Sequence, residues 1–387
     1  MTKVGSSPLS LPSPANPGST RDPWISWGGK GEEERLRVAA VGLGWVTTNR
    51  HLPWLLRDRR VSVAGVIDPH RERVDRVAAR HRVRHVAVTA DPGEVPWLSQ
   101  VDAVTVGTPP RTHASLARSF LDAGKHVLLE KPFAVSPGEA ADLEEAARRA
   151  GRVLAVVHNF QFSRSITRLR RLVAEGALGE LRSIWGVQLS NPRRRLPAWY
   201  EDLPLGLFYD ESPHLLYLVR CLSPTEPVAD QARILRSRGG HATPHQVDLA
   251  MHAADVSVRI SIDFEAPVSE WQLAVLGSRR LAVVDLFRDV LVVVGNDGLH
   301  RGREIVGTSW AALRTHLLGV AASGSLLLRG RLSYGNDEVI RRFVGACLEG
   351  GTPDGIAAAD GRRVTALQHW VIARCSEDPA REQLLPS

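Results

Sequence analysis

The chain has 387 residues, of which 43% are hydrophobic and 24% charged, an ordinary composition for a globular protein with room for two domains. Its net charge of +7 at first suggests a nucleic-acid-binding protein, but the basic residues are spread along the chain and their one dense run, Arg193 to Arg195, is short. With eight Phe and four Tyr the chain also lacks the interleaved aromatic and basic residues that stack bases, so we expect no nucleic-acid partner.

Residues 1–35 are rich in Pro, Ser and Gly and have no apolar core of a secretory signal, so we expect a disordered tail. We find no run of about 18 apolar residues and expect no membrane partner. The cysteines, Cys221, Cys347 and Cys375, are far apart and lack the spacing of a metal site or a disulfide framework. A cytoplasmic protein without a bound metal is expected.

The first ordered segment predicts a nucleotide-binding strand, turn and helix. An apolar run from Leu36 to Val41 is followed by Gly42 and Gly44, a helical stretch, and a second apolar run that ends at Asp68. This is the arrangement of a dinucleotide-binding βαβ unit. Gly42 permits the sharp turn, and Gly44 lets backbone amides at the helix N-terminus approach a pyrophosphate. Trp45 and Val46 belong to this predicted loop, whereas Thr47 stands where the motif has its third glycine.

Asp68 favours NAD as the cofactor. It lies 24 residues after Gly44, where a carboxylate accepts hydrogen bonds from the adenosine ribose and repels a 2′-phosphate. Arg71 is close enough to turn toward such a phosphate, so NADP remains an alternative. Asp68 is also a candidate N-cap for a helix that begins near Pro69.

Further strand and helix patterns continue to residue 158 and predict a parallel, doubly wound sheet. Ligands bind at the carboxyl ends of the strands of such a sheet. The polar or loop residues expected at these ends, and hence near the cofactor, are Thr108, Pro109, Glu130, Lys131, His158 and Asn159.

After residue 160 the pattern changes to strands with one polar face. Val256, Val258, Ile260, Ile262 and Phe264 alternate with polar residues, and turn signals separate the strands that follow. Amphipathic segments near 335–348 and 359–375 end the chain. We expect an α+β domain with a mostly antiparallel sheet.

Lys131 is a candidate catalytic residue because only four of the 49 basic residues are lysines, and residues 124–133 hold two of them. An ammonium is compact and can exchange its proton, which a guanidinium cannot do at working pH. The alternative is that a few lysines persist without any function.

These patterns together resemble the Gfo/Idh/MocA (glucose-fructose oxidoreductase/inositol dehydrogenase) family, most specifically over residues 104–132 and 158–184. The resemblance implies a Rossmann domain at 36–158 and a C-terminal domain at 159–387 with an open-faced sheet. It also implies an NAD(P)-dependent oxidoreductase of sugars or cyclitols. Because another subunit often covers the open sheet in this family, a homodimer or homotetramer is implied as well.

The family pattern GGxxxDxGxHxxD is similar to residues 205–217, with matches at Gly206, Asp210 and His214. Tyr217 stands where the family has an aspartate, which puts the grip on the substrate in doubt. The resemblance implies a catalytic set of Lys131, Asp210 and His214.

The residues around His214 support that role independently. Ser212 and Pro213 are typical of a helix start, which would place His214 in the first turn, where the helix dipole lowers the pKa of an imidazole. A neutral imidazole suits a general base near pH 7. Asp210 would precede the helix and either orient the ring or hold a substrate hydroxyl. Alternatively, His214 is only a first-turn residue.

The hypothesis is oxidation of a secondary alcohol or the reverse carbonyl reduction. His214 takes the hydroxyl proton, Lys131 stabilises charge on the same oxygen, and Asp210 fixes the imidazole. Glu130 places Lys131 or the nicotinamide ribose. An NAD-dependent redox glycosidase and a noncatalytic NAD sensor are the alternatives.

Residues 190–204 are expected to close over the cleft. They offer Arg193 and Tyr200 as substrate-binding residues, with Arg194 and Glu201 beside them. The arginines would meet a phosphate or a nucleotide-sugar diphosphate. The alternative is an ordinary solvated loop.

Overall fold

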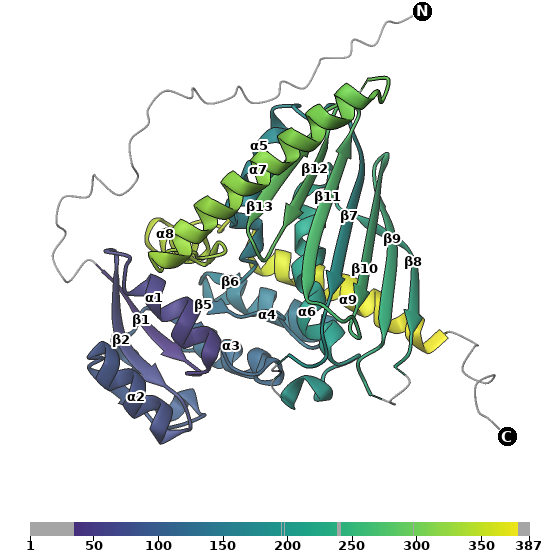
Figure 1. The fold of residues 1–387 in the computed structure, drawn as a ribbon. Helices are drawn as coiled ribbons and strands as arrows, with labels where there is room; N and C mark the ends of the chain where they lie inside the picture. The colour runs from purple at the N-terminus through teal and green to yellow at the C-terminus, as the bar shows by residue number, and fades with distance from the viewer. Residues whose placement is uncertain (1–34, 195, 197, 238–240, 297, 378–387) are drawn as a thin grey trace, which may run out of the picture. The chain divides into compact units, whose positions relative to one another are not determined.

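The computed structural model describes residues 35–194, 196, 198–237, 241–296 and 298–377, so the predicted tail at residues 1–35 lies outside it but for Arg35. Within residues 36–377 the chain forms two β-sheets, one of six strands and one of seven (Figure 1). Helices from both halves of the sequence cover them.

The six-stranded sheet is parallel throughout, as predicted, with the order β3-β2-β1-β4-β5-β6. Every residue of β4 is buried, since helices cover both faces of the sheet. Its strands are β1 (Leu36–Val41), β2 (Val61–Ile67), β3 (His85–Ala87), β4 (Ala103–Val106), β5 (His126–Leu129) and β6 (Leu154–Val156). The helices between them are α1 (Leu52–Leu55), α2 (Arg71–His81), α3 (His113–Asp122) and α4 (Pro137–Ala150).

Helices near the C-terminus complete the core of this first sheet. Ile340 and Phe343 of α8 (Asn336–Glu349) lie in one buried cluster with Val38 of β1 and Leu128 of β5. The next helix, α9 (Ala358–Glu377), contacts α4, β6 and α6. Both amphipathic segments predicted at the C-terminus are therefore helices, and the domain boundary at 158/159 stays a prediction.

The seven-stranded sheet has the order β13-β12-β11-β7-β10-β9-β8, and all neighbours are antiparallel except β7 and β10. The predicted alternation along β10 is confirmed, because Val256, Val258, Ile260 and Ile262 are buried. The strands are β7 (Leu181–Leu189), β8 (Val228–Leu235), β9 (Gln246–Ala253), β10 (Val256–Asp263), β11 (Glu270–Gly277), β12 (Leu281–Asp285) and β13 (Val290–Val294).

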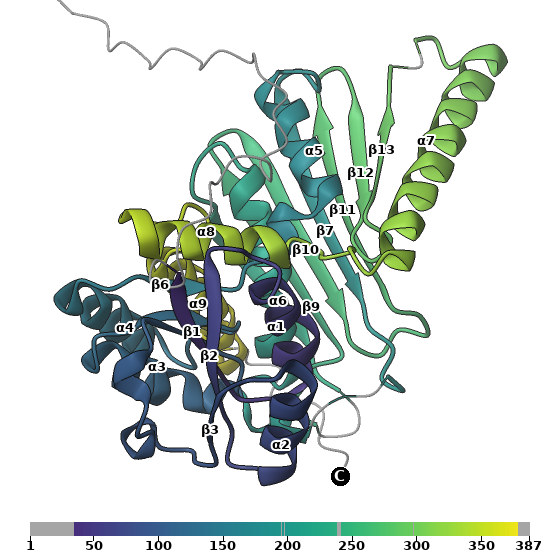
Figure 2. The ribbon, with the colours of Figure 1, turned by 90° about the vertical axis from the view of Figure 1, so that its left-hand side faces the viewer.

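One face of this second sheet packs against helices α5 (Arg164–Ala174) and α6 (Leu207–Leu222) (Figure 2). Leu215 of α6 lies against Gly186 of β7, where a larger side chain would crowd it. The mostly antiparallel α+β half is therefore as predicted, and α6 carries the residues expected to do the chemistry.

A long helix, α7 (Gly302–Leu328), follows β13 and packs on that edge strand. By length and composition it could cross a membrane. The expectation that no segment is long and apolar enough is therefore wrong. Polar residues inside the helix, among them Arg314, Thr315 and His316, break the run of apolar residues, so a search for about 18 consecutive apolar residues does not detect it.

Candidate active site

The glycine loop lies directly against the loop that follows β4. Gly42 has a φ of +76°, and a Cβ there would lie 2.5 Å from the Thr108 side chain. Gly44 is less crowded, since a Cβ would meet nothing closer than the Gly107 carbonyl oxygen at 4.0 Å. Gly42 thus makes the predicted turn, and Gly44 leaves space beside the backbone amides.

Asp68 shapes this loop from the end of β2. Its buried carboxylate accepts the Leu43 N–H at 2.7 Å and the His70 N–H at 2.8 Å. The N-cap of α2 is His70 without a side-chain capping bond, so the capping alternative for Asp68 is wrong. Arg73, not the predicted Arg71, approaches Asp68, with Nη1 3.6 Å from Oδ2. Arg71 faces Asp75 on the exposed side of α2.

A cavity of about 1100 Å³ runs along the carboxyl ends of the parallel strands. Asp68, His70 and Arg73 line one end, and Lys131 and Asp210 line the other. The predicted cofactor residues on its wall are Gly42, Gly44, Trp45, Val46, Asp68, Thr108, Pro109, Glu130 and Lys131. Its size and its glycine-lined middle fit a dinucleotide.

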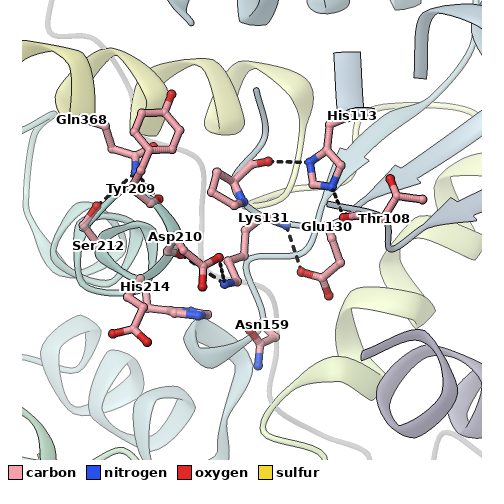
Figure 3. A network of polar contacts seen from close by, with 12 residues as sticks. Thr108, His113, Glu130, Lys131, Asn159, Tyr209, Asp210, Ser212, His214 and Gln368 are labelled. Carbon is pink, nitrogen blue, oxygen red and sulfur yellow. Dashed lines mark hydrogen bonds and ion pairs between the residues drawn. The ribbon is translucent and has the colours of Figure 1, made fainter. Parts of the chain in front are cut away.

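Lys131 and Asp210 form an ion pair at one end of this cavity (Figure 3). Lys131 follows β5, and its Nζ donates to Asp210 Oδ1 at 2.8 Å and to the Asp210 carbonyl oxygen at 3.1 Å. Burial alone would lower the pKa of Lys131, but the carboxylates of Asp210 and Glu130 outweigh it and raise that pKa. Lys131 is therefore an ammonium near neutral pH.

Glu130 fixes the backbone of Lys131 through a hydrogen bond. Its Oε2 accepts the Lys131 N–H at 2.9 Å, and its Oε1 lies 2.8 Å from His51 Nε2. His51 in turn contacts Thr105 Oγ1 at 2.7 Å through Nδ1. Burial opposes ionisation of Glu130, yet His51 and Lys131 hold its pKa below the usual value. Sequence reasoning missed His51 and Thr105, because no spacing links them to Glu130.

His214 lies in the second turn of α6, not in the first turn as predicted. The helix begins at Leu207, after Gly206 with a φ of +55°, and Pro213 lies inside it. Asp210 is therefore in the first turn, not ahead of the helix. The dipole acts mainly within the first turn, so it does not explain the state of His214.

Contacts from other segments allow this earlier helix start. Thr243 Oγ1 accepts the Leu207 N–H at 2.9 Å. Pro213 cannot donate to the Tyr209 carbonyl one turn earlier, and Gln368 of α9 donates to that oxygen instead, at 2.7 Å (Figure 3). The Ser-Pro pair therefore does not mark a helix start here.

Burial and nearby charge keep His214 neutral. Its pKa lies well below 6.5, chiefly because the ring is buried and then because the Lys131 ammonium and His158 lie near it. Figure 3 shows the imidazole beside the Lys131–Asp210 pair. The neutral imidazole that the sequence predicted is present, for a different physical reason.

Tyr217 orients the imidazole, a role predicted for Asp210. Tyr217 Oη lies 2.8 Å from His214 Nδ1, accepts the Phe160 N–H at 3.0 Å, and donates to Asn159 Oδ1 at 3.4 Å. When the Tyr217 hydroxyl donates to Asn159, its oxygen accepts the proton of His214 Nδ1. The lone pair of Nε2 is then available. The residue that replaces the family aspartate thus still contacts the histidine.

Two family models match the chain. Residues 36–158 match the oxidoreductase family with an NAD-binding Rossmann fold, and residues 166–283 match the Gfo/Idh/MocA C-terminal domain. The chain belongs to the Gfo/Idh/MocA family.

Curated relatives of this Gfo/Idh/MocA protein include two named enzymes. The chain is 28% identical over 295 residues to 1-carboxy-3-chloro-3,4-dihydroxycyclohexa-1,5-diene dehydrogenase of Comamonas testosteroni, covering 72% of each chain. It is 30% identical over 263 residues to dTDP-3,4-didehydro-2,6-dideoxy-α-D-glucose 3-reductase of Streptomyces violaceoruber, covering 65% of this chain and 72% of the reductase.

Among solved structures, GenD2 from gentamicin A biosynthesis, in complex with NAD, is similar in fold. The TM-score is 0.71 at 23% identity, and the match covers 92% of this chain and 97% of GenD2. The family models and this fold identify the Gfo/Idh/MocA protein as an oxidoreductase with a Rossmann domain for a nicotinamide dinucleotide.

The described residues between 190 and 202 include two that line the cavity of this Gfo/Idh/MocA protein, but they are not the predicted Arg193 and Tyr200. Leu196 and Trp199 line the cavity, whereas, among described residues, Arg193 and Tyr200 do not. Arg193 is exposed, and Tyr200 packs against the core of the second sheet. Side-chain chemistry in a loop could not show which positions face inward.

Arg194 is anchored to a buried carboxylate and cannot extend freely to a phosphate. Its Nη2 lies 2.5 Å from Glu211 Oε1, and Glu211 also accepts from Gln188 at 2.6 Å. Burial raises the pKa of Glu211, and Arg194 opposes that rise. Arg195 lies outside the described residues.

Asn159 and His113 support the site without lining the described cavity wall. Asn159 donates to the Tyr334 carbonyl at 3.0 Å and accepts from Tyr217. His113 lies 2.9 Å from the Thr108 carbonyl and 2.7 Å from the Pro132 carbonyl, as expected of a residue that supports the loop.

Within the described ranges, no group of His, Cys, Asp and Glu could hold a metal ion. Cys221 and Cys347 are free thiols, and burial raises the pKa of Cys221 to about 12. The side chain of Cys375 lies outside the described part of the chain.

Proposed function

We propose that this protein oxidises a secondary alcohol on a sugar, a cyclitol or a derivative of one, or reduces the corresponding ketone. The observation that carries the proposal is the Lys131–Asp210 pair on the wall of the dinucleotide cavity, with the buried imidazole of His214 beside it (Figure 3). They come from the loop after β5 and from α6, which are separate in sequence.

The cavity would hold a nicotinamide dinucleotide along the glycine loop, and Lys131 is part of the same wall. When bound, such a cofactor takes a hydride from a carbon atom or delivers one to it. Gly42, Gly44 and the loop at Thr108 would bind and orient it.

Lys131 would bind the substrate oxygen at the carbon that changes oxidation state. Its ammonium stabilises negative charge that develops on this oxygen during alcohol oxidation, or polarises the carbonyl in the reverse direction. Asp210 keeps Lys131 charged and aims Nζ, and Glu130 fixes the lysine backbone.

His214 would take the hydroxyl proton at Nε2 and return it in reduction. Tyr217 and Asn159 would hold the tautomer that leaves Nε2 free. Because His214 sits beside an ammonium, it releases the proton readily after the transfer.

NAD is the preferred cofactor in this proposal. The Asp68 carboxylate lies at the adenosine end of the cavity, where it disfavours a 2′-phosphate. The Asp68 oxygens already accept backbone N–H groups, and the Arg73 guanidinium lies beside them. Arg73 could therefore bind the 2′-phosphate of NADP, which stays the alternative cofactor.

The substrate class rests on chemistry shared by the relatives. The Streptomyces enzyme is named for a keto group on a nucleotide-linked sugar, and the Comamonas enzyme for a ring with hydroxyls. Both carry an oxygen on a ring carbon, which suits one Lys and one His around a single oxygen. The cytoplasmic location and homo-oligomeric state stay predictions.

The test combines cofactor binding with turnover. NADH and NADPH are titrated by fluorescence, and a panel of cyclitols, free sugars and dTDP- or UDP-sugars is then assayed in both directions. Stoichiometric NADH formation with a ring alcohol supports the proposal. Release of a sugar without net NADH indicates the redox glycosidase, and tight NAD binding without turnover across the panel indicates the sensor.

A further inference from the structure

Helix α7 exposes a continuous apolar stripe to solvent. Along it, apolar or small residues recur at alternating spacings of four and three. We call these residues the α7 seam: Val306, Trp310, Leu313, Leu317, Val320, Gly324 and Leu327. Trp310 is 70% exposed and Leu317 is 58% exposed. Such exposure of large apolar side chains along one helix is unusual for a surface that faces only water.

The opposite face of α7 is fixed to the folded protein. Gly319 packs against Val290 of β13. Arg164 of α5 donates to the Gly319 carbonyl at 3.2 Å and to Ser323 Oγ at 2.7 Å. On the helical wheel Gly319 and Ser323 lie outside the arc of the seam positions, on the side turned to the sheet. The seam side chains are therefore turned away from β13 and exposed, on a helix that lies along the β13 edge of the second sheet (Figure 2).

We propose that the α7 seam packs against the α7 seam of a second copy of this chain. Alternating spacings of four and three, sustained over three heptads, are typical of a helix that packs on another helix. A two-fold axis would let the same side chains interlock from both sides. This inference does not depend on the proposed dehydrogenase activity.

The exposed apolar area is sufficient for such a contact. The seam side chains and their exposed neighbours Ile305, Leu318 and Leu328 offer on the order of 600 Å² per copy, from typical side-chain areas. Specific interfaces bury about 800 Å² per partner. Adjacent residues would supply the remaining polar rim.

A membrane is the less favoured partner. Spanning a bilayer would require α7 to leave β13 and break its bonds to Arg164. Arg314 and His316 also lie in the middle of the helix, where a bilayer core disfavours them. The α7 seam is also distinct from the open face of the second sheet, which the family resemblance suggests as a subunit contact.

The test is the mass of the full chain by sedimentation velocity, over about a hundredfold range of concentration. Leu317→Glu should weaken association by about tenfold or more, since it places an unpaired carboxylate at the centre of the contact. Leu348→Glu is the matched control, because Leu348 is an exposed leucine near the C-terminal end of α8 and is 43% exposed. Circular dichroism and NADH binding verify the fold of each variant.

Hydrogen exchange supplies a second measurement. We expect amides of residues 310–320 to be more protected at high concentration than at low concentration in the parent, and not in Leu317→Glu. The proposal is overturned if the parent is a monomer throughout, or if Leu317→Glu leaves its mass unchanged. A monomer that binds anionic vesicles through Trp310 would assign the seam to a membrane surface instead.

Discussion

The Lys131 ammonium and the Asp210 carboxylate lie 2.8 Å apart across 79 residues of sequence, and this pair joins the loop after β5 to the first turn of α6. Each side chain is mostly buried, so the pair acts in a region with little solvent screening. It fixes the position and the charge of the group that we propose to bind the substrate oxygen.

Lys131→Met should lower kcat by roughly 10² to 10³ while NADH binding is retained, because a charge-stabilising donor is lost and the glycine loop is untouched. Steady-state kinetics and NADH titration measure the two effects. Lys125→Met is the control, since Lys125 donates to the Val101 carbonyl away from the cavity. Equal losses in both variants would contradict a specific role for Lys131.

Asp210→Asn should move the alkaline limb of the rate profile to lower pH. Asp210 helps to raise the pKa of Lys131, so the amide lets the ammonium lose its proton at a lower pH than in the parent. The measurement is kcat/KM against pH. Asp142→Asn, an exposed change on α4, should leave the profile as it is. If the alkaline limb stays at the same pH in Asp210→Asn, Asp210 does not raise the pKa of Lys131.

Tyr217→Phe should reduce kcat by about tenfold, since His214 loses the partner that fixes its tautomer. It should also cost about 1–3 kcal/mol of unfolding free energy, because the Phe160 N–H is left unpaired. Tyr209→Phe separates the two effects. Tyr209 Oη donates to the Ala134 carbonyl and, unlike Tyr217, does not bind His214, so this control should lose stability and keep its kcat.

His158→Phe should flatten the fall in stability at acid pH. Burial lowers the pKa of His158 to about 3, so below about pH 6.5 the unfolded chain binds a proton that the folded chain does not. Stability is therefore present above the unfolded pKa and is lost as pH falls toward the folded one. Phenylalanine retains the stacking on Tyr217 and cannot titrate.

The check on His158→Phe is the melting temperature measured from neutral to acid pH. The exposed change His252→Gln serves as the control, because His252 pairs with Asp230 at the surface. If the melting temperature of His158→Phe falls with pH as much as that of the parent, His158 does not account for the acid sensitivity of the fold.

Arg73→Ala should weaken NADPH binding by about tenfold and NADH binding little, because Arg73 is the cation beside Asp68 on the cavity wall. Arg71→Ala is the matched control, since Arg71 lies two residues away and faces Asp75. Fluorescence titration of each variant with NADH and NADPH measures the two affinities. A loss of NADPH binding in Arg71→Ala instead would restore the prediction made from the sequence.

Most of the cofactor-binding residues could be predicted from the sequence, because the motif that marks them is local. Gly42 and Gly44 follow a buried strand, and a carboxylate ends the next strand, as a parallel βαβ unit requires. Two of the residues predicted to line the cavity do not line it: Asn159, which binds Tyr217 and the Tyr334 carbonyl instead, and Arg71, whose place Arg73 takes. The direction of Arg71 and Arg73 depends on the rotation of α2 about its axis.

Lys131, Asp210 and His214 were nominated from the sequence by residue type and a family pattern, and their catalytic roles stay predictions. What the tertiary structure alone decided is how they are held. Gln368, 159 residues from Tyr209, satisfies the carbonyl that Pro213 leaves open, so α6 begins before the Ser-Pro pair. Tyr217 and Asn159, not Asp210, orient the imidazole. Contacts between distant segments have no periodicity in the chain, and burial, which sets the charge of His214, exists only after those segments pack.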